Sequence, residues 1–222
     1  MVWQGPHPVT SPRSRDLLER LDRACDDLDD LAFDAAWHDA VAGLGIVDAV
    51  REVLLPYLRL LGEQWERGTR SVAHEHFASG LSREHLLRVV GAAAEPVDGR
   101  PSVLVACPPG ERHDLGPLAF ATLLVDAGWR VDFLGADTPL VTLARACQLS
   151  RPDLVVVSGT RTTVLEARTS AWRRLAEDTV VVLGGAGATE ALAATTGLTC
   201  LDADVGVALS QVDALVRQRT AG

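Results

Sequence analysis

His113 is the residue of this chain whose surroundings best suit metal binding. It stands in the stretch Glu111-Arg-His113-Asp-Leu-Gly116, directly after the apolar run 103–107. That run predicts a buried strand, so we expect His113 on the loop that follows the strand. A histidine that binds a metal through one ring nitrogen commonly donates a hydrogen bond from the other to a carboxylate, and Glu111 could supply that carboxylate.

Two further motifs follow apolar runs. Ser158-Gly-Thr160 comes at the end of the run 154–158, and Gly184-Gly185 comes after the run 180–183. In an open parallel sheet, ligands bind at the carboxyl ends of the strands, near the topological switch point. We therefore expect the three motifs, which are scattered along the chain, to meet at one edge of one sheet.

Each motif also has a purely structural interpretation. A single histidine in a loop is often a surface residue, a glycine pair is often a turn that needs positive φ, and hydroxyl residues at strand ends bond the nearby backbone. The glutamate before His113 and the glycine after it favour the metal-ligand interpretation. For Gly184 and Gly185, a turn and a space left open for a ligand both remain as interpretations.

The second half of the chain predicts an α/β fold. Apolar runs of strand length at 103–107, 130–134, 154–158, 180–183 and 198–201 alternate with helical patterns at 115–127, 139–149, 163–176, 187–195 and 204–218. Such alternation predicts a parallel sheet with helices on both faces.

The first half predicts four helices. Ser14 could cap the first, which carries Leu17, Leu18, Leu21 and Leu28, and Asp30 could open the second. A third contains Leu54 to Trp65, in which Pro56 would either kink the helix or mark its start. The fourth follows the break at 68–71. Four helices with short loops predict a bundle, so we expect a helical bundle over 14–94 and an α/β domain over 101–222, divided at the Pro- and Gly-rich stretch 94–101.

The pattern Glu-x-His-x-x-Gly, together with Ser158-Gly-Thr160 and Gly184-Gly185, resembles the signature of base-off, histidine-on cobalamin-binding domains. The resemblance implies a flavodoxin-like (Rossmann-type) domain in which His113 is the lower axial ligand of cobalt. It also implies that Glu111, Gly116, Ser158, Thr160, Gly184 and Gly185 surround the ligand and the buried dimethylbenzimidazole tail. The family pattern more often has a leucine where this chain has Thr160.

A second pattern lies in the helical half. Trp65, nine intervening residues and Glu75-His76 resemble the W-x9-E-H signature of light-sensing cobalamin domains, such as those of the B12-dependent repressors of carotenoid synthesis. The resemblance implies that the bundle caps the upper face of adenosylcobalamin, with Trp65 against the adenosyl group and Glu75 and His76 in contact with it. Without the resemblance, Trp65 would be a core aromatic and Glu75 a helix-start carboxylate that favours the dipole.

The resemblance implies a sensor rather than an enzyme. Photolysis of the cobalt–carbon bond would change the packing of the cap and then oligomerisation or contacts to an effector domain or regulator protein. In the photocobilin subfamily a biliverdin lies beside the B12. A biliverdin bound in addition to adenosylcobalamin is therefore a further alternative for this chain. Two other interpretations stay open: a corrinoid methyl carrier of a methyltransferase system, and a B12-binding antirepressor-like adaptor.

The chain departs from the repressors in two ways. Their DNA-binding winged helix precedes the bundle, whereas this bundle is expected to start near residue 14. They also carry a histidine directly after the tryptophan, where this chain has Glu66. We therefore expect no DNA-reading domain here, and a light state with a second histidine ligand would need His74 or His76.

Charge and composition exclude some classes of binding partner. The formal net charge of −9 argues against direct binding of nucleic acid, which depends on clustered Lys and Arg. No signal sequence or membrane-length apolar run is evident, so we expect a soluble cytoplasmic protein that forms a homo-oligomer. The four cysteines form no C-x-x-C pair, which makes a disulfide framework or zinc site improbable.

Overall fold

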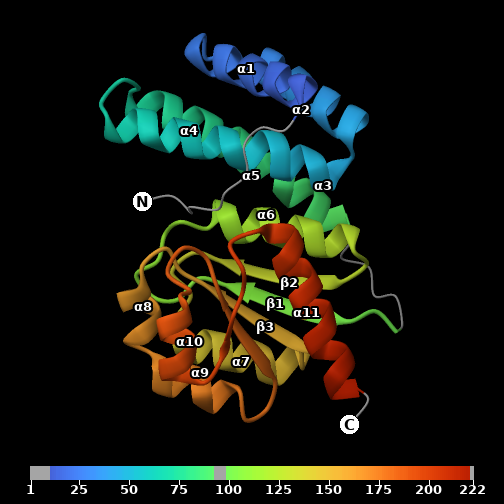
Figure 1. Cartoon of the computed structure of the whole chain (residues 1–222), viewed down its shortest axis with the longest axis vertical. Coiled ribbons are helices and arrows are strands. Elements are labelled where there is room, and N and C mark those ends of the chain that lie inside the picture. Colours follow the sequence, from blue (N-terminus) through green and yellow to red (C-terminus); the bar gives the residue numbers. More distant parts are fainter. Residues whose placement is uncertain (1–10, 93–98, 221–222) are drawn as a thin grey trace. The chain divides into compact units, whose positions relative to one another are not determined.

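The computed structural model describes residues 11–92 and 99–220. The chain forms two compact units that divide after Arg88. Helices make up the first, here called the helical unit, and a sheet with flanking helices makes up the second, here called the sheet unit (Figure 1). This order confirms the predicted combination of helices followed by α/β structure. The expected division at 94–101 stays a prediction, because residues 93–98 lie outside the described ranges.

The helical unit contains four helical segments. They are α1 (Pro12–Asp26), α2 (Asp30–Leu44), a continuous segment of α3 (Ile46–Asp48), the π-helix η1 (Ala49–Leu54) and α4 (Leu55–Glu66), and finally α5 (Val72–Ala92). Pro56 lies in the first turn of α4. The helix nevertheless runs through it, because η1 widens the preceding turn and the Leu55 N–H bonds to the Val50 carbonyl five residues back.

The start of α1 differs from the prediction. Ser11, and not Ser14, is the N-cap, and its Oγ accepts a hydrogen bond from the Ser14 N–H at 3.0 Å. Pro12 suits the first turn of a helix, since its missing N–H has no partner there, and the helix therefore begins earlier than expected. Ser14 is buried inside the helix and its hydroxyl donates to Glu52 Oε2 at 2.6 Å.

The turn between α1 and α2 also differs. Asp30 is the first residue of α2, as expected, and Asp29 before it is the N-cap, since its Oδ1 accepts from the Ala32 N–H at 2.9 Å. Leu28, expected on the apolar stripe of α1, lies in the turn with φ +52 and is 49% exposed. The helix ends at Asp26, so the apolar periodicity extended two residues too far.

Aromatic rings and a buried ion pair hold the helical unit together. Phe33 makes edge contacts with Tyr57 and Phe77, at centroid distances of 6.0 Å and 6.1 Å. Arg70, from the turn between α4 and α5, is 7% exposed and pairs with Asp22 at 3.0 Å and Asp26 at 2.8 Å on α1. The α4–α5 turn is thereby fixed to the C-terminal end of α1.

The sheet has five parallel strands in the order β2-β1-β3-β4-β5. This is the flavodoxin-like order, whose switch point lies between β1 and β3. The strands are β1 (Ser102–Ala106), β2 (Arg130–Gly135), β3 (Leu154–Ser158), β4 (Val180–Gly184) and β5 (Thr199–Cys200). The predicted runs therefore correspond to the strands to within one or two residues.

Helices cover both faces of the sheet (Figure 1). Buried side chains of α7 (Leu140–Ser150), α9 (Thr169–Leu175) and α10 (Glu190–Thr196) pack on one face. The helices α6 (Leu115–Asp126) and α11 (Val205–Thr220) contact each other. The single helix predicted over 163–176 is two, α8 (Thr162–Glu166) and α9, and the Trp172 indole of α9 donates to the Leu165 carbonyl of α8 at 2.9 Å.

None of the helices within the described ranges combines the length and the apolar character that crossing a membrane requires.

We predict that Arg70→Gln lowers the free energy of unfolding of the helical unit by about 2 kcal/mol. Breaking a buried ion pair costs about 3 to 5 kcal/mol, and the figure is smaller here because Asp26 is more than half exposed. Arg67→Gln is the matched control from the same turn; its exposed pair with Glu63 contributes less than about 1 kcal/mol. Urea unfolding followed by far-UV circular dichroism measures both. Equal losses in the two variants would contradict the anchoring role of Arg70.

Candidate functional site

The loop between β1 and α6 is held by the loop that follows β2. Gly110, with φ +83, donates its N–H to Asp137 Oδ1 at 2.7 Å. The Asp137 N–H in turn donates to the Glu111 carbonyl at 2.8 Å. These bonds bring Glu111 into the sheet edge, where it is 1% exposed.

The buried carboxylate of Glu111 joins two loops. Its Oε1 accepts from the His113 backbone N–H at 2.9 Å and lies 2.6 Å from His113 Nδ1. Its Oε2 accepts from the Thr160 backbone N–H and hydroxyl, both at 2.7 Å. Burial by itself raises the pKa of Glu111, but the hydrogen bonds from Thr160 and His113 outweigh burial and hold the pKa at about 2. Glu111 is therefore a carboxylate at neutral pH.

This contact orients the ring of His113. The hydrogen bonds that the described residues make to the ring all use Nδ1, and the side chain is 66% exposed. A neutral ring that donates from Nδ1 to a carboxylate presents the lone pair of Nε2. A His113 ring that donates from Nδ1 to Glu111 has the tautomer and the supporting carboxylate that are typical of a metal-binding histidine.

Thr160 serves a different contact from the one expected. Both of its donors, the backbone N–H and the hydroxyl, go to Glu111. The hydroxyl thus fixes the carboxylate that orients His113. A direct contact of Thr160 with a cofactor stays a prediction.

Ser158 and the glycine pair lie side by side. Ser158 is the last residue of β3, is 6% exposed, and is in register with Gly184. Gly185 has φ +83, and a Cβ there would lie 2.6 Å from the Gly159 carbonyl oxygen. A Cβ on Gly184 would meet no atom closer than 3.7 Å. The turn interpretation therefore accounts for Gly185, whereas at Gly184 the protein itself does not demand a glycine.

The sequence analysis did not single out Gly187, and it used Gly159 only as part of the motif Ser158-Gly-Thr160. The Gly187 N–H donates to the Gly159 carbonyl at 2.8 Å, and a Cβ on Gly187 would lie 2.6 Å from the carbonyl carbon of Arg161. The run Gly184-Gly-Ala-Gly187 was the signal that could have identified Gly187. These contacts set the course of the loop after β4.

Gly116 lies near the N-terminus of α6 and is exposed. A Cβ at this position would meet nothing within 4 Å. Packing within the described residues therefore does not require a glycine, and the open space beside it is available to a ligand.

The three residues singled out in the helical unit lie around the α4–α5 turn. Trp65, in the last turn of α4, is 48% exposed, so its interpretation as a core aromatic is wrong. Glu75 Oε1 accepts from the Ser79 hydroxyl at 2.7 Å, and Oε2 lies 2.6 Å from His76 Nδ1. His76 is itself 76% exposed. The structure thus presents an indole, a carboxylate and an imidazole on one end of this unit.

Comparison with known proteins identifies both units. Residues 101–217 match the family model described as a B12 binding domain, and residues 17–86 match a second model with the same description. The HTH-type transcriptional repressor CarA of Myxococcus xanthus is 35% identical over 84% of this chain, which spans only 64% of that relative's length. The dimethylamine corrinoid protein of Methanosarcina barkeri is 27% identical over 63% of this chain and 69% of its own.

A solved structure shares the fold. The monomethylamine corrinoid protein of Methanosarcina barkeri superimposes with a TM-score of 0.72, at 15% identity, over 90% of this chain and 98% of its own. At that identity the likeness concerns the fold alone.

We predict that Glu111→Gln lowers the free energy of unfolding of the sheet unit by about 1.5 to 3 kcal/mol at pH 7, because hydrogen bonds to a charged acceptor are lost. The folded-state pKa of about 2 lies below the ordinary 4.5, so this stabilisation is present above pH 4.5 and is lost as the pH falls toward 2. The difference between the variant and the wild type should therefore shrink below pH 4.5. Urea unfolding at pH 7, 4 and 3 measures it, with exposed Glu177→Gln as the control. A difference that does not change with pH would contradict the assignment.

Proposed function

The chain belongs to the family of B12-binding domains, and from this premise we propose that it is a light-sensing regulatory module that binds adenosylcobalamin. One observation carries the proposal: the buried Glu111 carboxylate holds Nδ1 of His113 at 2.6 Å while the histidine side chain stays exposed. This arrangement suits a lower axial ligand of cobalt.

The residues present fit the cofactor. Within residues 11–92 and 99–220, no group of three or more His, Cys, Asp or Glu side chains could hold a metal ion. In the proposal His113 would be the one protein ligand of a metal that a macrocycle already holds. Gly116 leaves open space beside the His113 loop. The hydroxyl of Ser158 and the bare backbone of Gly184 would take the nucleotide tail. When bound, the cofactor supplies a weak cobalt–carbon bond that light can break.

The helical unit supplies groups suited to the adenosyl side. The exposed indole of Trp65 offers a flat apolar wall for an adenine. Glu75 can accept hydrogen bonds from ribose hydroxyls, and His76 bonds to the same carboxylate. These protein groups perform no covalent chemistry in the proposal. They hold the cofactor and transmit its change to the packing of the unit.

The similarity to the repressor CarA supports a regulatory role. The chain spans less than two thirds of that relative's length. We therefore also propose, and do not take from the relative, that an effector or regulator receives the signal and that the chain assembles in a light-dependent way. A role as a corrinoid methyl carrier is the second candidate, favoured by the similarity to the dimethylamine corrinoid protein. None of the comparisons supports the binding of a biliverdin, and we propose adenosylcobalamin alone as the cofactor.

We predict that His113→Ala abolishes the absorption spectrum of base-off, histidine-ligated cobalamin. Retention of the cofactor should fall by more than the roughly 10- to 100-fold that is lost when only the hydrogen-bond partner of a metal-binding histidine is removed. Arg112→Ala, the exposed neighbour on the same loop, is the matched control and should bind as the wild type does. Absorbance titration with adenosylcobalamin measures both variants. Unchanged histidine ligation in His113→Ala would remove the basis of the proposal.

We predict that green light changes both the spectrum and the size of the protein loaded with adenosylcobalamin in the dark. Loss of the adenosyl group would leave a void beside Trp65 that a close-packed unit fills by moving. Sedimentation before and after illumination, with the spectrum recorded alongside, measures the change. Complete photolysis without a change in size or shape would favour the methyl carrier or an adaptor.

A variant of the same experiment tests the role of Trp65. Trp65→Ala should reduce the preference for adenosylcobalamin over methylcobalamin by about tenfold, since one aromatic contact is worth about 1.4 kcal/mol. Because Trp65 is 48% exposed, the variant should remain folded. Leu87→Ala, which truncates another exposed apolar side chain of the unit, should leave the preference unchanged.

A further inference from the structure

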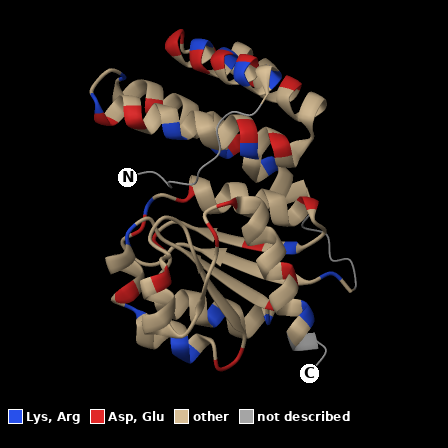
Figure 2. Ribbon diagram, viewed as in Figure 1, with Lys and Arg blue, Asp and Glu red and all other residues tan. Residues whose placement is uncertain are grey.

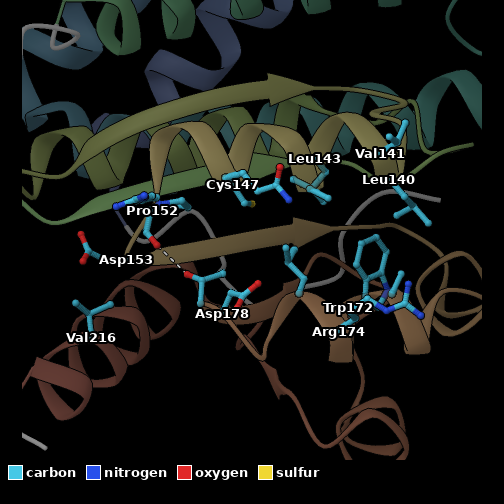
Figure 3. A pocket seen from close by; sticks show the side chains of 16 residues that line it. Leu140, Val141, Leu143, Cys147, Pro152, Asp153, Trp172, Arg174, Asp178 and Val216 are labelled. Carbon is cyan, nitrogen blue, oxygen red and sulfur yellow. Dashed lines mark hydrogen bonds between the residues drawn. The ribbon is translucent and has the colours of Figure 1, made fainter.

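The sheet unit has a second feature that the proposed function does not use, a groove between α7 and α9. Its volume is about 1010 Å³ (Figure 3). Buried Leu143 and Trp172 form apolar parts of its wall, and Val141, 77% exposed, lies on its rim. None of the residues of the candidate cobalamin site lines this groove.

Two arginines of the groove, Arg151 and Arg174, have no partner among the residues that the structure describes. Among the described residues, no ion pair or hydrogen bond uses the guanidinium of Arg151 or Arg174. The carboxylates of the lining are engaged elsewhere: Asp153 accepts from the backbone and the hydroxyl of Ser102, and Asp178 also has a partner. The groove therefore combines an apolar wall with two cationic groups that are free to meet an anionic partner.

The helical unit presents a surface with the complementary properties. The segment 27–31, here called the acidic leucine turn, consists of the turn between α1 and α2 and the first two residues of α2. Leu28 and Leu31 are 49% and 76% exposed, and all three of its aspartates are exposed. Figure 2 shows acidic residues at the tip of the hairpin formed by α1 and α2. Exposed leucines between carboxylates would match a groove with an apolar wall and arginines.

Backbone strain marks both surfaces. Within the described ranges the non-glycine residues with positive φ are Leu28, Asp137 and Arg151, at +52, +50 and +46. Asp137 is explained by its bond to Gly110. Leu28 and Arg151 occupy positions that glycine would adopt at lower cost. Both residues end a helix, Leu28 after α1 and Arg151 after α7, where a left-handed residue is common; Leu28 lies in the acidic leucine turn and Arg151 in the groove.

We propose that the acidic leucine turn of one copy docks in the α7–α9 groove of a second copy. Leu28 and Leu31 cover the apolar wall, and Asp27 and Asp30 pair with Arg151 and Arg174. Removal of apolar surface from water stabilises the contact, and the charges select its orientation. One turn in one groove is smaller than a standard interface of about 1,600 Å², so the self-association is weak. Because the contact uses no residue of the candidate cobalamin site, it does not depend on the proposed function.

Sedimentation velocity of the full chain, as purified and in the dark, tests the proposal over about 1 to 500 µM, the range of a weak contact. The size should rise with concentration, and less so in high salt. Arg151→Glu with Arg174→Glu should weaken association by about tenfold or more, and so should Asp27→Arg with Asp30→Arg, since like charges would then face each other. All four changes in one chain should restore it, because the charges are exchanged.

Matched variants separate this contact from general charge and folding effects. Arg145→Glu changes a charge of α7 that does not line the groove, and Asp16→Arg changes an exposed charge of α1; both should associate as the wild type does. Leu31→Ser, which keeps all charges, should weaken association, and circular dichroism checks that each variant is folded. The proposal is overturned by a wild type that stays monomeric across the range, by charge reversals without effect, or by a four-fold variant that is not restored.

Discussion

The geometry of the candidate site depends on one buried carboxylate. Glu111 is nearly inaccessible, yet it stays ionised because four hydrogen bonds, two from His113 and two from Thr160, replace the water that it loses. Such bonds to a charged acceptor are among the stronger ones in proteins. They connect the loop after β1 to the loop after β3, which are the two loops that flank the switch point of the sheet. A single side chain thus couples the ring orientation of His113 to the position of Thr160.

The surrounding fold positions the loops that meet at the Glu111 carboxylate. Adjacent parallel strands bring Ser158 and Gly184 into register, and the loop after β2 bonds to Glu111 through Asp137. The tight packing of Gly185 and Gly187 against residues 158–161 fixes the last of the three loops. The edge is therefore preorganised by the protein itself, and a cofactor would meet groups that already have their orientation.

In the helical unit, too, a buried charged side chain holds a loop in place. Arg70 is buried between two aspartates of α1 and holds the turn that follows Trp65 and precedes Glu75. Its neighbour at the same end of α1, the acidic leucine turn, has its leucines in water instead. One end of this unit thus contains a buried ion pair that positions a proposed binding motif and an exposed surface suited to a partner.

The sequence by itself determined the order of the elements and the positions of the strands, and it predicted His113 as a metal ligand. Periodicity is a local property, and a run such as 154–158 can be read without knowing its neighbours. The contact between Glu111 and His113 was also predicted from the sequence, since the two residues are only two positions apart. By contrast, helix ends depended on caps, so that Ser11 took the place expected for Ser14 at the start of α1.

Only the tertiary structure decided the contacts between distant segments. Thr160 lies 49 residues from Glu111 in the chain, and no local pattern states that its hydroxyl would bond the carboxylate rather than a ligand. The division of roles between Gly184 and Gly185 required the positions of Leu201 and Gly159. Trp65 fell on an apolar stripe, yet the end of α4 leaves it exposed. Burial and hydrogen bonding depend on which elements meet in space, and spacing along the chain does not contain that information.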